Sequence, residues 1–184
     1  MKKISIDITK TFIPHPMQLF IIGTTKNDST PNLGVFSWLN FCYDDDLSVS
    51  LCLDGNKLTK ERIISNKIFS VNMVIEEMLP YVKKLIKASD DNKKLVCEKF
   101  LLGKGEVLNV PIIENSPLVY ELEVKRIIEL NGSTIFICKI RNTLIANSIL
   151  TKRKEYNLQK ISPVFVSLNS YYKLMTDKKL GTWS

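Results

Sequence analysis

A polar turn that leads into an expected helix holds the groups best suited to bind an anion. Asp54, Gly55 and Asn56 are turn formers. Lys57 and Thr59 then stand at the first turn of the helix, where backbone N–H groups are free and the dipole favours negative charge. An ammonium group and a hydroxyl at such a place predict a phosphate site. The alternative is an ordinary helix entrance with a solvated lysine.

The strand before this turn is expected to have one apolar and one small polar face. Between positions 47 and 53, Leu and Val alternate with Ser48, Ser50 and Cys52, a period of two residues that turns the apolar side chains inward. A face of Ser and Cys lets a flat ring lie close to the strand. A flat ring beside a phosphate site matches flavin mononucleotide (FMN), so the sequence predicts that FMN binds here.

Short apolar runs predict the other strands of the first half, at residues 17–25, 32–41 and 68–74. Trp38 has apolar neighbours on both sides, which favours a strand covered on both faces. Whether Trp38 touches a bound ring or only fills the core stays open at this stage.

Helical spacing predicts three helices, at residues 58–66, 78–86 and 91–102. In the second, Met78, Leu79, Val82, Leu85 and Ile86 form the apolar face, and Pro80 fits only in the first turn. In the third, we expect Leu95, Val96, Phe100 and Leu101 to be buried and Gly103 to stop the helix.

The second half is expected to be β-structure. Asn131 and Gly132 separate two long runs, at 120–130 and 133–146, and this dipeptide is a strong hairpin signal. In the first run Tyr120, Leu122 and Val124 alternate with Glu121, Glu123 and Lys125, and a bulge near 127–128 would explain why the order then fails. A last strand is expected at 164–168. Six or seven strands with helices between the early ones predict a mainly β fold with helical insertions, an antiparallel barrel.

Composition narrows the class of protein. The chain has 184 residues, of which 45% are apolar, which is enough to bury a core as a single domain over residues 1–184. No apolar run reaches the length of a signal peptide or a membrane span, so we expect a cytoplasmic protein with no membrane contact. Four scattered cysteines and one histidine give no zinc or iron–sulfur ligand set, and we expect the cysteines to be reduced and mostly buried.

Other candidate sites have simpler explanations. Asp44, Asp45 and Asp46 could bind a cation, but they lack the spacing of a calcium loop and are better explained as a solvated turn. His15, between two prolines, fits an extended entry to the first strand. Ser37 is better explained as a flavin hydrogen-bond donor, or as an inward strand hydroxyl, than as a nucleophile, because no histidine can pair with it.

The net charge of +7 leaves a second class of function open. A basic β-barrel without redox activity could bind single-stranded nucleic acid through a charged groove and stacking aromatic residues. Against this alternative, the basic residues are spread along the chain and do not interleave with Phe36, Trp38 and Phe41. We therefore expect no nucleic acid partner.

The order and spacing of several segments resemble a known family. These segments are the Ser37–Trp38 pair, the strand VSLCL, Thr59 before a helix that leads into FSVN, the tripeptide EKF at 98–100, and VPIIENSPLVYELEV. Together they resemble the flavin reductase-like family of FMN-binding split β-barrels, which includes flavoredoxins and flavin reductases. The resemblance covers about residues 13–175.

The resemblance implies a six- or seven-stranded Greek-key split barrel that pairs as a homodimer, with FMN bound non-covalently near the subunit interface. It places the ring against main-chain groups of Val35, Phe36, Ser37 and Trp38. It places the ribityl phosphate at residues of the next turn and helix start, Asp54, Gly55, Asn56, Lys57 and Thr59, and it adds Leu53 to the residues that bind the cofactor. It further implies NADH or NADPH as co-substrate, or an electron-transfer protein as partner.

The chain departs from the family pattern in three places. Asp44, Asp45 and Asp46 replace two prolines, and Cys138 and Lys139 replace a Gly-Glu pair. Thr134 stands where reductases commonly carry the histidine that lies near the nicotinamide. The missing histidine favours electron transfer with a protein over direct oxidation of NAD(P)H, and we assign no residue as catalytic acid or base.

Overall fold

In the computed structural model, most of the chain forms one large sheet with helical insertions. The structure describes residues 1–7, 9–10, 14–26, 30–88, 95–151, 155–157, 160–174 and 181. The large sheet has seven strands, all antiparallel, in the spatial order β3 (Pro31–Phe36), β2 (Phe20–Thr25), β6 (Ile68–Met73), β9 (Leu118–Glu129), β10 (Ser133–Ile145), β5 (Asp46–Asp54) and β4 (Leu39–Asp44). The mainly β class is confirmed, and this sheet has the seven strands expected of the barrel, although the described residues form twelve strands in all.

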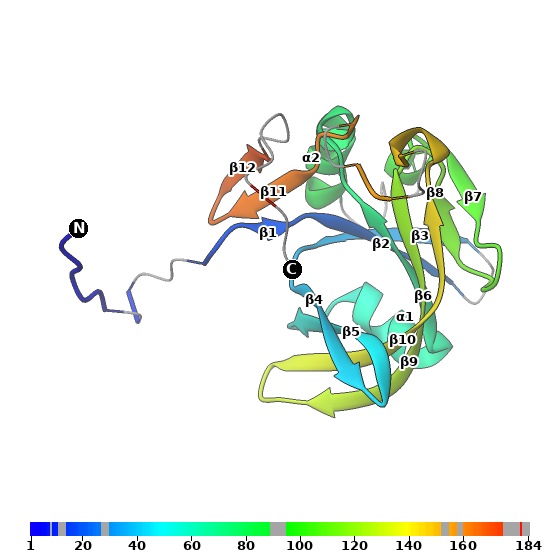
Figure 1. Cartoon of the computed structure of the whole chain (residues 1–184). Helices are drawn as coiled ribbons and strands as arrows, with labels where there is room; N and C mark the ends of the chain where they lie inside the picture. The colour runs from blue at the N-terminus through cyan, green and yellow to red at the C-terminus, as the bar shows by residue number, and fades with distance from the viewer. Residues whose placement is uncertain are drawn as a thin grey trace.

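The two edge strands of this sheet are consecutive in the chain, which shows how the sheet curls. β3 pairs with β2 and β4 pairs with β5, yet only Ser37 and Trp38 separate β3 from β4. The sheet must therefore coil until its two edges meet at this bend, as in a barrel that is open along one seam (Figure 1). The prediction of a single strand over residues 32–41 is wrong, because the chain changes its pairing partner at the bend.

Two smaller sheets and two helices complete the described structure. One small sheet contains β1 (Met17–Gln18), β11 (Val164–Ser167) and β12 (Ser170–Lys173), and the other contains β7 (Leu102–Lys104) and β8 (Pro111–Ile113). The helices are α1 (Leu58–Asn66) and α2 (Leu79–Lys87), with single 3₁₀ turns at Glu76–Met78 and Asn147–Ile149. No helix of the described residues is long and apolar enough to cross a membrane.

β2 is buried on both faces and separates two hydrophobic cores. Phe20 and Ile22 face the core inside the coiled sheet, while Leu19 and Ile21 face a second core beneath α2. The period of two residues in a strand explains this division. α2 covers the second core with Val82 and Leu85, and its Pro80 lies in the first turn as expected.

The β9–β10 hairpin forms at Asn131 and Gly132, as the sequence predicts, and Gly132 has the positive φ of +87° that this turn requires. The bulge lies slightly earlier than expected. The register shifts between Ile137 and Cys138, whose partners are Arg126 and Val124, so Lys125 is the extra residue. The predicted strand at 164–168 is present as β11, but the following strand β12 was not anticipated.

The third predicted helix is only partly correct. Its first residues, 91–94, lie outside the described part of the chain, and helical structure is present at 95–97. Leu95 and Leu101 are exposed, at 62% and 68%, whereas Phe100 is buried. Gly103 does not stop a helix: it lies in β7 opposite Ile112, because the chain after Phe100 pairs with β8.

Candidate functional site

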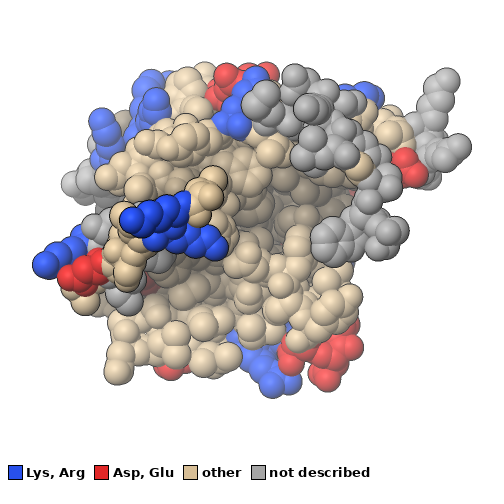
Figure 2. Space-filling model, turned by 60° about the vertical axis from the view of Figure 1, so that its left-hand side comes forward, with Lys and Arg blue, Asp and Glu red and all other residues tan. Residues whose placement is uncertain are grey.

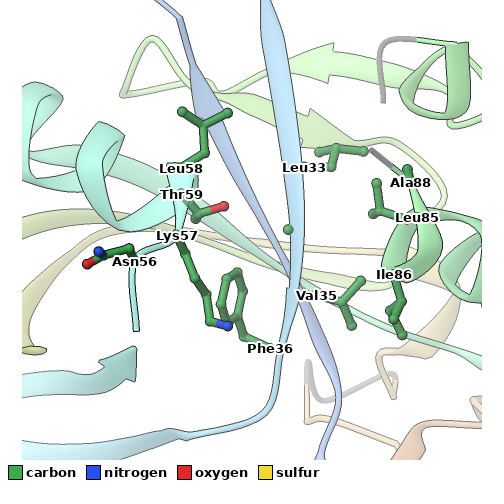
Figure 3. A pocket seen from close by; sticks show the side chains of 11 residues that line it. Leu33, Val35, Phe36, Asn56, Lys57, Leu58, Thr59, Leu85, Ile86 and Ala88 are labelled. Carbon is green, nitrogen blue, oxygen red and sulfur yellow. The ribbon is translucent and has the colours of Figure 1, made fainter. Parts of the chain in front are cut away.

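Two adjoining cavities lie where the bend, the outer edge of β3 and the start of α1 come together. The larger has a volume of about 410 Å³ and the smaller about 230 Å³. Both are lined by Val35, Phe36 and Lys57, so they form one continuous depression. Figure 3 shows the larger cavity, with the first turn of α1 on one side of β3 and α2 on the other.

The first turn of α1 presents backbone donors to this depression. Lys57 is the N-cap residue, its backbone is extended, and no side chain caps the helix. The first intrahelical bond runs from the Glu61 N–H to the Lys57 carbonyl at 3.2 Å, which leaves the amides of residues 58–60 for another acceptor. The Lys57 side chain is exposed, and no ion pair among the described residues involves it. An anion bound here would meet free amides and an ammonium group together.

Thr59 lies deeper in the larger cavity and fixes α1 against β3. It is only 3% exposed, and its hydroxyl accepts a hydrogen bond from Asn32 Nδ2 at 3.5 Å. The same Asn32 amide donates to Thr24 Oγ1 at 3.1 Å, so three buried polar side chains connect β2, β3 and α1. Since the Thr59 hydroxyl accepts this bond, its own hydrogen can be donated to a ligand.

Gly34 allows the helix and the strand to approach this closely. A Cβ atom at Gly34 would lie 2.6 Å from Thr59 Oγ1 and 2.6 Å from the Phe36 ring. Both distances are shorter than a van der Waals contact, so a side chain at this position would push Thr59 and Phe36 apart. The glycine therefore shapes the cavity wall.

The smaller cavity lies at the bend and against β5. It is lined by Val35, Phe36, Ser37, Trp38, Cys52, Asp54 and Lys57. The bend is held by hydrogen bonds from Leu39 N to the Ser37 carbonyl and from Cys52 N to the Trp38 carbonyl, both 3.0 Å long. Trp38 is 45% exposed, so the prediction that both faces of its strand are covered is wrong. The bend turns Trp38 out of the sheet and onto the cavity wall.

The predicted Ser and Cys face of β5 is present only in its second half. Ser50 and Cys52 are half-buried, and Cys52 lines the smaller cavity, whereas Ser48 is completely buried. The Ser48 hydroxyl donates to the carbonyl and carboxylate of Asp46. Leu47, expected inside, is 49% exposed. The accessible Ser and Cys face is therefore shorter than the sequence predicted, and it lies at the end of β5 that leads to Asp54.

The structure brings together most of the residues assigned to cofactor binding. Eight of them line one or both cavities: Val35, Phe36, Ser37, Trp38, Asp54, Asn56, Lys57 and Thr59. The Leu53 side chain lies in the core, at 1% exposure, so only its main chain could meet a ligand. Gly55 forms the turn, and its N–H donates to the Gly132 carbonyl at 2.8 Å.

The sequence did not indicate the wall that α2 contributes. Leu85, Ile86 and Ala88 line the larger cavity together with Leu33, Gly34 and Leu58. Ile86 was expected on the buried face of its helix, yet it is 55% exposed. In the sequence, the signal for this wall was Ile86 itself, which matches the apolar period but lies at the end of the helix.

The three aspartates form a turn in which Asp45 and Asp46 are exposed, as expected of a solvated turn, and ion pairs hold the carboxylates. Asp45, with φ of +67°, is the tip between β4 and β5. Lys125 Nζ lies 3.3 Å from Asp44 Oδ2 and 3.1 Å from Asp46 Oδ1, and Arg126 lies 2.7 Å from Asp44. The hydrogen bond from Lys125 keeps the pKa of Asp46 below its ordinary value. No group of potential metal ligands occurs among the residues that the structure describes.

Thr134, for which the resemblance predicted the position of a histidine in reductases, is completely buried. Its hydroxyl donates to Glu129 Oε2 at 2.8 Å, on the neighbouring strand of the hairpin. His15 is exposed at the entry to β1, with its Nδ1 3.1 Å from the Pro16 carbonyl oxygen, which agrees with an extended entry segment.

The cysteines are outside any disulfide, as expected, but only two of the four are buried. Cys97 and Cys138 are buried, and Cys42 and Cys52 are half-buried. Burial raises the pKa of Cys138 to about 12, so this thiol stays protonated at neutral pH.

Charge is distributed in separate groups on the visible surface. Figure 2 shows one face, in which Lys and Arg stand in several small groups around a hollow lined by uncharged residues. This distribution lacks the continuous basic stripe expected of a nucleic-acid-binding face.

Comparison with known proteins gives one family and a group of similar folds. The family model of the flavin reductase like domain matches residues 14–159. The structure is similar to flavoredoxin of Desulfovibrio vulgaris (Miyazaki F), with 22% identity, coverage of 99% of this chain and 97% of that chain, and a TM-score of 0.85. It is also similar to nitrilotriacetate monooxygenase component B from Bacillus cereus, with 15% identity, coverage of 98% and 100%, and a TM-score of 0.84.

A third similar structure is the FMN-binding protein from Thermus thermophilus, with 14% identity, coverage of 99% of this chain and 100% of that chain, and a TM-score of 0.78. At these identities the likeness establishes the fold. No curated protein matches the chain.

Proposed function

The chain belongs to the flavin reductase-like family, and from this premise we propose that it binds FMN non-covalently and carries electrons through it. The observation that carries the proposal is the uncapped first turn of α1. Its free amides, Lys57 and the Thr59 hydroxyl all face one cavity, and that cavity continues to the bend at Ser37 and Trp38.

The charges along the depression orient the cofactor. Asp54 is exposed and lines the smaller cavity, so a phosphate would be repelled there. Lys57 lines both cavities, and Thr59 lines the larger one only. We therefore place the phosphate on α1 and the ring at the bend, against Val35, Phe36 and the main chain of Ser37. β3 is an edge strand of the large sheet, so the groups on its outer edge lack a strand partner and can bond the ring.

In this assignment, FMN supplies the redox chemistry by accepting and donating electrons at its ring. The chain supplies binding and orientation. Lys57 and the α1 amides neutralise the phosphate, Gly34 lets β3 lie close to Thr59, and the half-buried Cys52 leaves room for a flat ring beside β5. Cys138 is protonated and buried in the core, so it takes no part.

We further propose that the electron partner is a protein. The resemblance places Thr134 where reductases carry a histidine, and Thr134 is buried and bonded to Glu129, so it does not supply the group that the histidine would offer to a nicotinamide. The alternative within the same proposal is that NADH or NADPH reduces the flavin directly. Anaerobic mixing of the loaded protein with each nucleotide distinguishes the two. Bleaching of the flavin within seconds would establish direct reduction.

A homodimer is part of the proposal. Trp38, Phe41, Tyr43 and Leu47 are all exposed, at 45%, 55%, 85% and 49%, and they follow one another along the bend, β4 and β5. Exposed apolar side chains grouped in this way are typical of a contact with another chain. A second copy that covers them would also cover the bend and exclude water from the ring.

The phosphate assignment is tested by replacing Lys57 and Thr59 with alanine together. A hydrogen bond to a charged group contributes about 1.5 to 3 kcal/mol, so we expect FMN affinity to fall by at least tenfold. Thr59→Ser retains the hydroxyl and serves as the control, with affinity close to that of the original chain. Unchanged affinity in the double variant would refute the placement of the phosphate, even if the fold is correct.

A further inference from the structure

Three basic side chains of β9 and β10 are paired with acids of the chain. Lys125 and Arg126 form ion pairs with Asp44, and Lys139 forms one with Asp46. With Asp45 between them, three acids meet three bases, so the charges around the β4–β5 turn cancel. The net charge of +7 therefore arises elsewhere in the molecule.

Unpaired lysines stand beside the larger cavity, at the start of α1 and in the last turn of α2. We call them the lysine rim: Lys57, Lys60, Lys84 and Lys87. No ion pair among the described residues involves any of the four. Both helix ends line the cavity, so the rim stands on two sides of it (Figure 3).

The excess of positive charge lies on the α2 side of the rim. On the α1 side, Glu61 follows Lys60 in the first turn, and a bound FMN phosphate would neutralise Lys57. In contrast, α2 contains three lysines and no acid. The six residues that follow Ala88 hold as many acidic as basic side chains, so they leave this balance unchanged.

An exposed apolar side chain accompanies the charge on α2. Ile86 is 55% exposed and lines the cavity, and Lys87 follows it directly. Interfaces between proteins commonly combine an apolar centre with a polar rim, and complementary charge steers the partners together. Electron-transfer complexes are among the smallest interfaces, so one short helix can supply such a surface.

We propose that the exposed face of α2 with Lys84, Lys87 and Ile86 is the docking surface for the electron partner, and that this partner is an acidic protein. The inference rests on the proposed function, which assigns a protein as electron partner. An acidic surface complements the two lysines and meets no acid of α2. Docking there sets the partner beside the cavity in which we place the flavin.

The surface is tested with two forms of one redox protein that differ in charge. Cytochrome c is basic, and succinylation of its lysines makes it acidic. Surface plasmon resonance measures the affinity of each form for the full chain at about 10 mM and about 100 mM salt, where the Debye length is about 30 Å and about 10 Å. At low salt we expect the succinylated form to bind at least tenfold more tightly than the native form. At the higher salt its affinity should fall at least fivefold.

A double variant locates the binding on α2. At about 100 mM salt, Lys84→Glu with Lys87→Glu should weaken binding of succinylated cytochrome c at least tenfold. FMN affinity should change by less than twofold, because neither lysine lines the cavity. The matched control is Lys2→Glu with Lys3→Glu, which alters the net charge equally in an exposed segment away from α2 (Figure 1). It should weaken binding by less than threefold.

Electron transfer is measured with the FMN-loaded protein after anaerobic photoreduction with EDTA as electron donor. Two ferric haems are reduced for each reduced flavin, one electron passes to each haem, and two protons pass to the solvent. We expect the succinylated form to be reduced faster than the native form, and the α2 double variant to lose this advantage. Docking without reduction of the haem would refute the role of the surface in electron transfer.

The other outcomes separate this inference from the proposed function. Equal affinity for the two cytochromes, or equal losses in the two double variants, would refute the docking surface. Tighter binding of a single-stranded oligonucleotide than of succinylated cytochrome c would refute an acidic protein as the partner. Since docking is measured without flavin, a chain that docks but binds no FMN would refute the proposed function and leave the surface standing.

Discussion

Two groups of backbone N–H donors in this protein differ in the acceptor that is available to them. In the first, the Glu121 carboxylate is completely buried and accepts hydrogen bonds from the amides of Glu106, Val107 and Leu108 at 3.0, 3.0 and 2.5 Å. Asn142 Nδ2 donates a fourth at 2.8 Å. In the second, at the start of α1, no side chain caps the amides, and Lys57 stands beside them.

The difference separates a structural anion site from the proposed ligand site. Gly105 lets the loop fold over the carboxylate, since a Cβ there would lie 2.5 Å from Glu121 Oε2. In the first group, a carboxylate of the chain itself accepts the hydrogen bonds of the amides, and the loop covers this carboxylate. The other group opens onto a cavity and is bordered by a cation, which is the arrangement expected where the anion is supplied by a ligand.

The largest effect is expected from removal of the internal anion. In Glu121→Ala, three backbone amides and the Asn142 side chain lose their acceptor inside the protein. A hydrogen bond to a charged group contributes about 1.5 to 3 kcal/mol, so we expect the free energy of unfolding to fall by at least about 3 kcal/mol. Urea unfolding followed by circular dichroism measures this change.

Glu123→Ala is the matched control for this prediction. Glu123 lies on the same strand, but it pairs with Arg141 at 2.5 Å on the surface, where both side chains are about 40% exposed (42% and 41%). Such pairs typically contribute less than about 1 kcal/mol. Equal losses of stability in the two variants would show that the hydrogen bonds of the loop amides to Glu121 add no stability.

A smaller loss of stability is expected from a substitution in β3, at its contact with the start of α1. Gly34→Ala places a methyl group 2.6 Å from both Thr59 Oγ1 and the Phe36 ring, and overpacking of this kind typically costs about 1 to 3 kcal/mol. FMN affinity should fall as well, because both neighbours line the cavity. Gly181→Ala is the control, since nothing lies within 4 Å of its added Cβ. Full stability and full affinity in Gly34→Ala would contradict the close approach.

A third variant gives the uncapped amides at the start of α1 an anion from the chain itself. In Lys57→Asp, an aspartate at the N-cap accepts hydrogen bonds from the first-turn amides, so we expect a gain of about 0.5 to 2 kcal/mol in the free energy of unfolding. FMN affinity should fall at least tenfold, because the phosphate acceptors are replaced. Lys60→Asp makes the same change of charge one position after Thr59 and should do less of both. A variant that is more stable and still binds FMN fully would place the phosphate elsewhere.

Local signals explain what the sequence predicted correctly. The Asn131–Gly132 turn, the helix at 58–66 and the strand at 68–74 each depend on neighbours within a few residues, and all three are present. The sequence also predicted that Lys57 and Thr59 lie together, because both are adjacent to the turn that positions them, and both line the larger cavity. The family resemblance added the prediction that the flavin ring lies at the bend.

Contacts between distant residues explain what the sequence did not predict. The bend at Ser37 arises because β3 and β4 pair with different strands, and no local pattern marks such a change. The α2 wall depends on where that helix packs. Glu121 alternates with apolar residues and was expected on the polar face of its strand, yet a loop fifteen residues earlier folds over it. A single sequence does not reveal such long-range partners.

The last prediction uses pH to separate the two groups of amides in one molecule. Burial alone would raise the pKa of Glu121, but hydrogen bonds from Leu108, Asn142, Val107 and Glu106 outweigh it, so its pKa lies below the ordinary value of 4.5. A carboxyl whose pKa is lower in the folded state stabilises the protein above its unfolded pKa, and this contribution is lost as pH falls through the folded pKa. We therefore expect the free energy of unfolding to decrease below about pH 4.5, and to decrease less steeply in Glu121→Gln, which has no proton to gain there. Asp46, whose pKa is also lowered, is unchanged in both proteins, so the difference between the two urea titrations from pH 7 to pH 3 belongs to Glu121. At the start of α1 no carboxylate of the chain is bonded to the amides. If the free energies of unfolding of the two proteins fall in parallel with pH, then the charge of Glu121 does not stabilise its loop, and this loop does not differ from the open start of α1 in that respect.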